Sequence, residues 1–449
     1  MDKFELFHNV EETVGGYQKF KAEHQKKSID VWEDISICDK QNYLLSYPIT
    51  ELIRKDSFDK CFLIGASSGF SKSGSVLWLK QSEDEEAYIE QVKGLLVHDY
   101  QIDKKSTLII VSLALGTWIG GMQLASAMRS MAGKMDGVVS ATPGINLKES
   151  VHIVEEFGAM FDQIVWVTNP SSINIIYSLL KDNKDLMDAK IYFPVVGEYF
   201  TESFRETISK KFGHNVDHAF VVKTGYGSAD TGDLGIESEA TIKLRKYLNN
   251  NPKISLSLFD DENPPMFFIK NDEAYLETVK GNLIVTKDQF VPLVRYDTHD
   301  TGGLLQKSSL KEANFPEAIL ADLPDEILYI FGRTSDSVIF YGTNLNIYDS
   351  GDFLNSLDES YAYGGLFEVE KISKDNIDFI EFTIYVLEEK KELEQAYQEV
   401  LINSLKASSN EFAAKYDELK SAIHEDLIRI NIRLVTEKNN AVKHHTIRR

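Results

Sequence analysis

The chain has 449 residues, of which 43% are hydrophobic and 26% charged, so it is typical of an ordered globular protein and too long for one small domain. It carries 48 Lys and Arg against 70 Asp and Glu, a formal net charge of −22. A field of this sign repels nucleic acid and anionic membrane surfaces, so we expect neither as a partner. The two cysteines, Cys38 and Cys61, exclude a disulfide framework and a cysteine-rich zinc site.

The sequence favours a cytoplasmic protein. Its first residues are polar and contain no apolar signal core. The most apolar run, Leu108 to Met122, is shorter than the roughly 20 residues that a transmembrane helix needs. Two cysteines without a disulfide framework also fit a reducing compartment.

Apolar and amphipathic stretches alternate between Thr107 and Val222. This alternation predicts a layered α/β core around a largely parallel sheet. Strands are expected at Leu108–Val111, Gly137–Ser140, Ile164–Val167 and Ile191–Val196, and helices at Leu147–Phe161, Ser171–Leu180 and Thr201–Phe212.

The pattern changes after Gly225 and again near Gly332. Short apolar runs between turn-rich segments predict an antiparallel β portion, with strands at Ile254–Phe259, Ala274–Val279 and Asn282–Thr286. The last region predicts strands near Leu366–Val369, Phe379–Leu387 and Leu427–Val435, with helical spacing from Glu388 to Glu425. We therefore expect a boundary between residues 1–332 and 333–449.

A loop of small and hydroxyl side chains follows an apolar run. It reads Gly65-Ala66-Ser67-Ser68-Gly69-Phe70-Ser71-Lys72. Backbone N–H groups, hydroxyls and a lysine together suit a phosphate. The loop also matches the Gly-x-Ser-x-Gly elbow of a serine hydrolase, with Ser67 as nucleophile. An elbow leads from strand into helix, whereas Ser75–Leu79 predicts a second strand, so we favour a phosphate loop. A surface turn is the plain alternative.

Two later segments concentrate groups that suit a nucleotide. Tyr226, Ser228 and Asp230 lie on a glycine-rich turn, where a ring can stack on a base and a carboxylate can hold magnesium. Asp300 closes the segment that starts at Pro292, and a carboxylate there can accept bonds from ribose hydroxyls. The alternatives are a turn whose Asp bonds its own backbone and an Arg–Asp pair closing a loop.

Taken in order, these segments resemble those of the adenylate-forming enzymes. The serine-glycine loop precedes the Tyr-Gly-Ser-x-acid turn, a Pro-Leu-x-Arg-Tyr…Asp segment and Gly332-Arg333-Thr334-Ser335-Asp336. The length, the glycine-rich residues 115–121 and Gly197-Glu198 are similar to the phenylacetate–CoA ligase-like branch. The resemblance implies an α/β fold with a large layered N-terminal adenylation domain that includes a β portion (1–332) and a small mobile α+β lid domain (333–449).

The resemblance also implies a reaction. The chain would activate a small carboxylic acid with ATP and Mg²⁺ to acyl-AMP and pyrophosphate. It would then pass the acyl group to a thiol of coenzyme A or of the phosphopantetheine of an acyl carrier protein. Residues on matching positions would take four roles. Trp118, Gly120 and Gly121 would line the acid pocket, Asp230 would hold the metal, and Ser228 and Lys443 would act on the carboxylate and the α-phosphate. The residues that would bind ATP are Ser67, Ser68, Gly69, Ser71, Lys72, Gly197, Glu198, Tyr226, Gly227, Asp300 and Arg333.

Several positions depart from the family's pattern. Phe70 replaces a threonine, Asp230 replaces the usual Glu, and Lys443 lacks the usual preceding Gly. A nucleotide-binding protein with weakened catalysis therefore stays open as an alternative, beside the hydrolase that would use Ser67.

Overall fold

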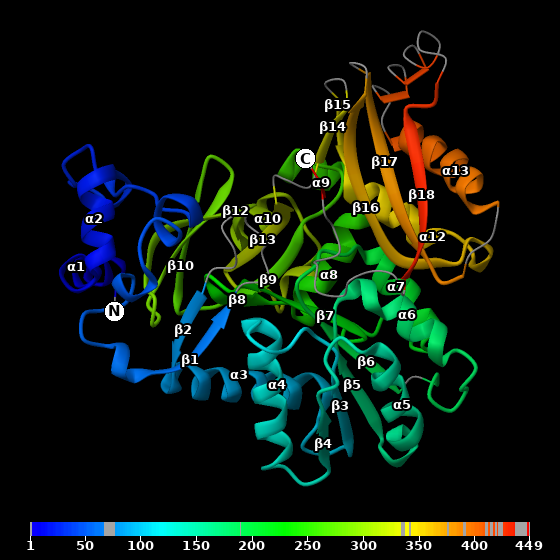
Figure 1. The fold of residues 1–449 in the computed structure, drawn as a ribbon, viewed down its shortest axis with the longest axis horizontal. Coiled ribbons are helices and arrows are strands. Elements are labelled where there is room, and N and C mark those ends of the chain that lie inside the picture. Colours follow the sequence, from blue (N-terminus) through cyan, green and yellow to red (C-terminus); the bar gives the residue numbers. More distant parts are fainter. Residues whose placement is uncertain are drawn as a thin grey trace.

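The computed structural model describes most of the chain. The described residues are 2–66, 77–188, 190–333, 337–340, 343–374, 377–388, 392–408, 412–413, 416–417, 420, 425–435 and 447–448. One sheet of eleven strands runs through the larger part of the molecule, and a separate four-stranded sheet lies at the upper right of Figure 1. Among the described residues, no helix combines the length and the hydrophobicity that crossing a membrane requires.

One half of the large sheet is parallel, as predicted. Its strands stand in the order β7-β6-β5-β3-β4, and each pairs in parallel with its neighbour. Their bounds are β3 (Thr107–Val111), β4 (Val138–Ala141), β5 (Gln163–Val167), β6 (Ile191–Val195) and β7 (Val222–Ser228). The four predicted strands and the three predicted helices of this region are confirmed within a few residues.

Helices cover both faces of this parallel half. Leu108 and Ile110 of β3 pack with the helices α5 (Leu147–Phe157), α6 (Pro170–Leu180) and α7 (Glu202–Lys211). Ile109 and Val111 of the same strand face α3 (Ser82–Tyr100) and α4 (Ile119–Ala132). Because successive side chains of a strand point to opposite faces, a strand buried on both sides reads as a continuous apolar run.

The other half of the sheet is antiparallel. From β7 outward the strands pair antiparallel in the order β8, β9, β13, β12, β11 and β10. Their bounds are β8 (Gly232–Ile236), β9 (Met266–Lys270), β10 (Ala274–Val279), β11 (Asn282–Lys287), β12 (Leu293–Gln306) and β13 (Glu326–Arg333). The helices beside them are α8 (Glu239–Asn249), α9 (Pro252–Phe259), α10 (Lys307–Glu312) and α11 (Glu317–Leu320).

One strand prediction in this half is wrong. Residues Ile254–Phe259 belong to the helix α9, which begins at Pro252. Proline suits the first turn of a helix because its missing N–H would have no partner there. A short apolar run cannot be assigned to strand or helix by its periodicity alone, and the proline is the signal that favoured the helix.

The N-terminal residues form a lobe at the left of Figure 1, and they share its hydrophobic core with apolar residues between Phe290 and Tyr296. It contains α1 (Lys3–Thr13), α2 (Gly15–His24), single turns at Trp32–Asp34, Lys40–Leu44, Ile49–Glu51 and Phe58–Lys60, and the antiparallel pair β1 (Cys61–Ala66) and β2 (Leu77–Gln81). Buried Arg295 of β12 joins the lobe to the sheet, since its Nη1 donates to the backbone oxygens of Glu33 and Ile35 at 2.8 and 2.6 Å.

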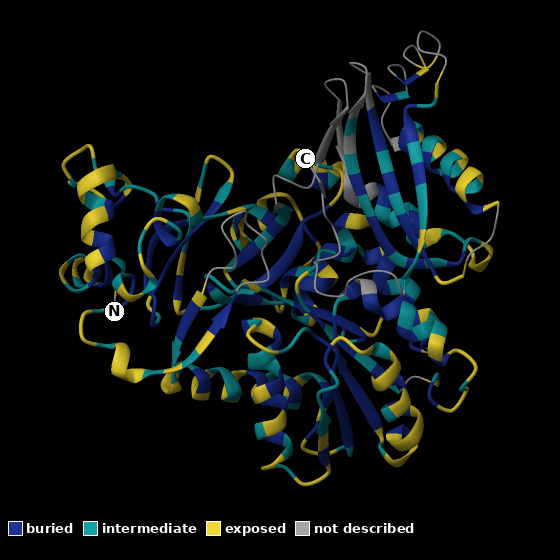
Figure 2. Ribbon diagram, in the orientation of Figure 1, coloured by how far each residue is buried: buried dark blue, intermediate teal, exposed yellow. Residues whose placement is uncertain are grey.

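The region after Gly332 contains the four-stranded sheet, in the order β18-β17-β16-β19, and a separate pair of strands, β14 and β15. Its elements are β14 (Ser337–Phe340), β15 (Thr343–Asn346), α12 (Ile347–Ser356), a turn at Glu359–Tyr361, β16 (Tyr363–Lys374), β17 (Ile377–Val386), α13 (Leu393–Ser408), β18 (Ile428–Leu434) and β19 (Ile447–Arg448). Phe367, Phe382 and Tyr397 form part of a separate buried core, and dark blue runs through both sheets in Figure 2. The boundary between residues 332 and 333 stays a prediction.

Candidate active site

A cavity of about 400 Å³ lies at the carboxyl ends of β5, β6 and β7, where open α/β sheets bind ligands. Its wall includes most of the predicted site residues that the structure describes. These are Trp118, Gly120, Gly121, Gly197, Glu198, Tyr226, Gly227 and Ser228. They come from segments far apart in the sequence, so the fold gathers the motifs that the sequence presents in order.

Tyr226 and Asp300 meet at this edge of the sheet. The Tyr226 hydroxyl donates to Asp300 Oδ2 at 2.7 Å, and the Tyr226 ring lies 5.6 Å from that of Phe268. Tyr226 stands near the end of β7, where the strand leaves the buried core. Asp300 lies on β12, and its backbone is paired with Arg333 at the end of β13. An aromatic face beside a carboxylate offers a base and a ribose the contacts that each needs.

The turn after β7 carries Ser228 and Asp230. The Ser228 hydroxyl accepts from the backbone N–H of Asp230 and of Thr231, both at 3.2 Å, so it caps its own turn. Tyr296 donates its hydroxyl to Asp230 Oδ2 at 2.7 Å. Burial, and then the Asp230 carboxylate, raise the pKa of Tyr296 far above its ordinary value. Tyr296 is therefore a positioning residue for Asp230, which the sequence did not single out.

Asp230 fits magnesium as a single carboxylate. Proteins commonly hold Mg²⁺ through one or two carboxylates together with substrate phosphates, rather than in an all-protein cage. The described residues include no group of three or more His, Cys, Asp or Glu that could hold a metal. Tyr296 takes one oxygen of Asp230, and no described residue hydrogen-bonds to the other.

The glycine-rich start of α4 lines the cavity, and its two glycines differ in the space that a side chain would find. A Cβ on Gly121 would lie 2.0 Å from the backbone oxygen of Ala114, so glycine is required there. A Cβ on Gly120 would meet nothing within 4 Å and would enter open space. Gly197 has φ +86°, a conformation that favours glycine.

The predicted phosphate loop lies outside the described residues, including Ser67, Ser68, Gly69, Ser71 and Lys72. The strands on either side of it, β1 and β2, pair antiparallel. The Ala66 N–H donates to the oxygen of Thr117 at 2.6 Å, and Ala66 lines the cavity. The chain thus enters this loop from the cavity wall. It returns in a strand and not in the helix that a hydrolase elbow requires.

Two other predicted site residues lie late in the chain. Arg333 ends β13, directly beside Asp300 in register. Lys443 lies outside the described residues, so its catalytic role stays a prediction. The described parts of the two regions contact each other, since Asn174 Nδ2 donates to Asn355 Oδ1 at 3.2 Å.

The far wall of the cavity holds polar side chains that sequence reasoning missed. Lys223 and Asp99 form an ion pair, with side chains only 5% and 1% exposed. Asp233 of β8 accepts from Gln91 Nε2 of α3 at 2.7 Å. Burial raises the pKa of the Asp233 carboxyl to about 6. Asp233 and Gln91 are 142 positions apart in the sequence, so spacing gave no signal for their contact.

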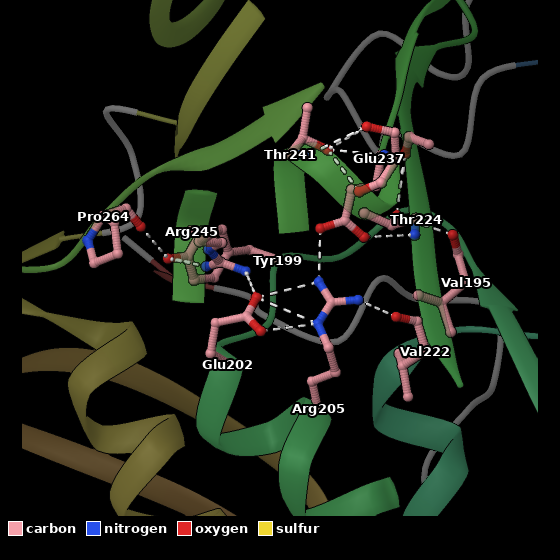
Figure 3. A network of polar contacts seen from close by, with 12 residues as sticks. Val195, Tyr199, Glu202, Arg205, Val222, Thr224, Glu237, Thr241, Arg245 and Pro264 are labelled. Atoms are coloured by element: carbon pink, nitrogen blue, oxygen red, sulfur yellow. Dashed lines mark hydrogen bonds and ion pairs between the residues drawn. The ribbon is translucent and has the colours of Figure 1, made fainter. Parts of the chain in front are cut away.

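A network of buried charged side chains hydrogen-bonds to the backbone of β7, as Figure 3 shows. Arg205 of α7 donates to Glu237 at 2.6 Å, to Glu202 at 3.0 Å and to the oxygen of Val222. Glu237 Oε2 accepts the N–H of Thr224 at 2.9 Å. Thr224 lies two positions before Tyr226 on β7, so the network fixes the strand that carries the aromatic ring.

The same network reaches toward the C-terminal region. Arg245 of α8 donates to Glu202 at 3.3 Å and to the Tyr199 hydroxyl at 2.7 Å. Tyr199 and Asp352 of α12 line a common small cavity. Arg205, Glu202 and Glu237 are each 2% exposed or less, so their charges are compensated by one another and not by water.

Comparison with known proteins identifies the fold. No family model and no curated protein matches the chain. The crystal structure of 2-hydroxyisobutyryl-CoA ligase in the postadenylation state, in complex with R3-HIB-AMP, is 12% identical with a TM-score of 0.66, over 98% of this chain and 87% of that one. The same ligase in the thioesterification state, in complex with 2-HIB-AMP and CoA, has a TM-score of 0.51 and 12% identity, again over 98% of this chain and 87% of that one.

A third structure is the acyl acid amido synthetase AtGH3.15 in complex with 2,4-DB. It is 11% identical with a TM-score of 0.57, over 99% of this chain and 91% of that one. The chain therefore has the fold of the adenylate-forming ligases, with a large central α/β sheet and a smaller C-terminal sheet. The phenylacetate–CoA ligase-like branch stays a prediction.

Proposed function

We propose that this chain, which has the adenylate-forming ligase fold, activates a small carboxylic acid with ATP and then transfers the acyl group to a thiol. One observation carries the proposal. Tyr226 lines a cavity of about 400 Å³ and is hydrogen-bonded to Asp300 at its edge, and the cavity also offers apolar surface from α3 and α4. Such a site suits a nucleotide and an acyl chain side by side, which an acyl-adenylate requires.

In the first half-reaction, a carboxylate oxygen attacks the α-phosphorus of ATP. An oxygen–phosphorus bond forms, and the bond to pyrophosphate breaks. Tyr226 would stack on adenine, and Asp300 would accept a ribose hydroxyl. Magnesium, when bound, would neutralise phosphate charge, with Asp230 as its protein ligand and Tyr296 orienting that carboxylate.

Positive charge and N–H donors near the α-phosphate stabilise the charge that develops there. We assign the phosphate loop 67–72 to this task, because Ala66, which directly precedes it, lines the cavity. We assign Lys443 to the same task because its position matches the family's catalytic lysine. Ser228 would contact the carboxylate of the substrate acid, close to the α-phosphate. Trp118, Gly120 and Gly121 would border the acyl chain, and Gly197 with Glu198 the adenine.

In the second half-reaction, a thiol attacks the acyl carbonyl carbon. The bond to AMP breaks, and the thiol loses its proton. We infer that residues 333–449 act as a lid that changes position between the two steps. The TM-score is 0.66 against the ligase in its postadenylation state and 0.51 against the same ligase in its thioesterification state, which supports a described arrangement closer to the former. Coenzyme A and the phosphopantetheine of a carrier protein are the candidate acceptors.

The direct test is acid-dependent ATP–pyrophosphate exchange with a panel of aromatic and aliphatic acids. Exchange should require both the acid and magnesium, and Asp230→Ala should reduce it and raise the magnesium requirement. Wild-type metal dependence in that variant would remove Asp230 from the metal site. ATP binding without exchange on any acid would favour a nucleotide-binding protein that lacks the chemistry.

A substitution at Lys443 should affect the two half-reactions differently. Lys443→Ala should slow acyl-adenylate formation by about 10²–10³-fold, the usual effect of removing one such contact. It should largely spare thioester formation from a supplied acyl-adenylate. Lys438→Ala is measured in parallel, because Lys438 is the next candidate for this role. Equal losses in both steps would contradict the assignment, and no loss in either would leave Lys438 and Lys72 as candidates.

A further inference from the structure

The part of the cavity wall formed by α3 and β8 holds a carboxylate that the adenylation step does not use. Asp233 stands opposite Gly227 in the β7–β8 register, beside the residues assigned to the reacting end of the acid. A Cβ built on Gly225 would lie 3.9 Å from Asp233 Oδ1, an ordinary van der Waals distance, so the carboxylate lies beside the backbone of β7. Asp233, Gly225 and Gln91 all line the cavity.

Asp233 shares the cavity with apolar residues. Those on α3, α4 and β8 include Val92, Leu96, Leu124, Met128 and Ile236. The Asp233 carboxylate accepts from Gln91 Nε2 and from the backbone N–H of Gly235. A carboxylate offers about four acceptor positions, so two bonds leave capacity for further donors. The Gln91 amide oxygen is a second acceptor at the same place.

Two lysines near this carboxylate have other partners. Lys287 donates its Nζ to the backbone oxygen of Asp233 at 2.8 Å, and Lys223 pairs with Asp99. Lys80 lines the same cavity, where burial lowers its pKa and the charges of Asp84 and Glu85 partly offset that shift. Across the part of the chain that the structure describes, no lysine hydrogen-bonds to the Asp233 carboxylate itself. The Asp233 carboxylate therefore keeps acceptor capacity toward the cavity, where a donor on a bound ligand can use it.

Resting on the activity proposed above, we propose that the acid carries a hydroxyl or amino group on its acyl chain, which donates a hydrogen bond to the Asp233 carboxylate. An acid without a donor would displace water from a half-buried carboxylate and leave part of its acceptor capacity unfilled. Sites built to hydrogen-bond a substrate hydroxyl reject the analogue that lacks it more strongly than apolar pockets reject a methylene. The structure thus favours hydroxy or amino acids over plain aliphatic and aromatic ones.

The experiment compares kcat/KM in ATP–pyrophosphate exchange for matched acids. The pairs are phenylacetate with 4-hydroxyphenylacetate, and hexanoate with its 2-, 3- and 6-hydroxy and amino derivatives. In the wild type, at least one donor-bearing acid should exceed its plain partner by about 10–100-fold, the range for a hydrogen bond to a charged group. Asp233→Leu should bring that ratio close to one, and Asp233→Asn should give an intermediate ratio.

Asp272→Asn is the control for removing an acidic side chain, because Asp272 is 93% exposed and lies outside the cavity. Equal rates for plain and donor-bearing acids in the wild type would overturn this inference and leave the ligase activity standing. A preference that survives in Asp233→Leu would also overturn it. No exchange with any acid in the wild type would remove the proposed activity, and the substrate class with it. If Asp233→Leu fails to fold, Asp233→Asn decides.

Discussion

Replacing Arg205 by methionine tests whether the buried charge network holds the strand that carries Tyr226. The substitution keeps the apolar stem but removes the donors to Glu202 and Glu237, which are 2% and 1% exposed. Glu202 would keep one contact at 3.3 Å with Arg245. Glu237 would keep only the N–H of Thr224.

The expected loss follows from that burial. Removing one partner of a buried ion pair leaves an uncompensated charge and costs about 3–5 kcal/mol. The free energy of unfolding should fall by that amount in urea titrations followed by tryptophan fluorescence, and the Kd for ATP should rise. The double variant Arg205→Met with Glu237→Leu should recover part of the loss, because the second change removes an unpaired carboxylate.

Lys243→Met is the matched control. Its partner Glu239 lies one turn away on α8, and both side chains are about half exposed. Such a pair contributes at most about 1 kcal/mol. If Arg205→Met destabilised the protein no more than Lys243→Met does, the network would not be a support of β7, and the reasoning from its burial would be refuted.

Three more outcomes follow from the site. Gly121→Ala should cost about 1–3 kcal/mol of stability, measured by urea unfolding, because its Cβ would clash with the backbone. Gly120→Val should leave stability nearly unchanged and narrow the range of acids accepted in pyrophosphate exchange. The pKa of Asp233 rises on folding from its ordinary 3.8 to about 6, so its ionisation weakens the folded state as pH increases. The stability of Asp233→Asn relative to the wild type should therefore increase by about 2–3 kcal/mol from pH 4 to pH 7 in urea titrations; an unchanged difference would contradict the burial of this carboxyl. Asp300→Ala should weaken ATP binding by about 1.5–3 kcal/mol in calorimetric titration, and Tyr226→Phe, which keeps the ring, should weaken it less. Wild-type affinity in a folded Asp300→Ala variant would remove that residue from the site.

The parallel half of the fold could be predicted from the sequence because its strands are buried on both faces. β3 reads Thr-Leu-Ile-Ile-Val, and all five residues are buried. Such runs have few alternative structures once turns flank them. Ile254–Phe259 shows the opposite case: its apolar run packs as a helix beside α8, and periodicity over so few residues did not decide between the two.

The candidate site was predicted where its residues stand in one local motif. Tyr226 and Ser228 share one turn, and Asp300 closes another, so their order along the chain was enough. Contacts between distant segments gave no such signal. Tyr296 and Asp230 are 66 positions apart, and Arg205 reads in the sequence as one more surface charge on an amphipathic helix. Only the folded sheet brings these groups out of water and into contact.

The junction at β7 has a consequence for how the protein is made. This strand is the seam of the large sheet, parallel to β6 on one side and antiparallel to β8 on the other. A ribosome would release the parallel half first, and that half can begin to collapse as a unit. Asp300, however, emerges 74 residues after its partner Tyr226. Under the proposed function, a nascent chain could not bind ATP through this pair before β12 has left the exit tunnel, so ATP could not act as a folding template for the first half of the molecule.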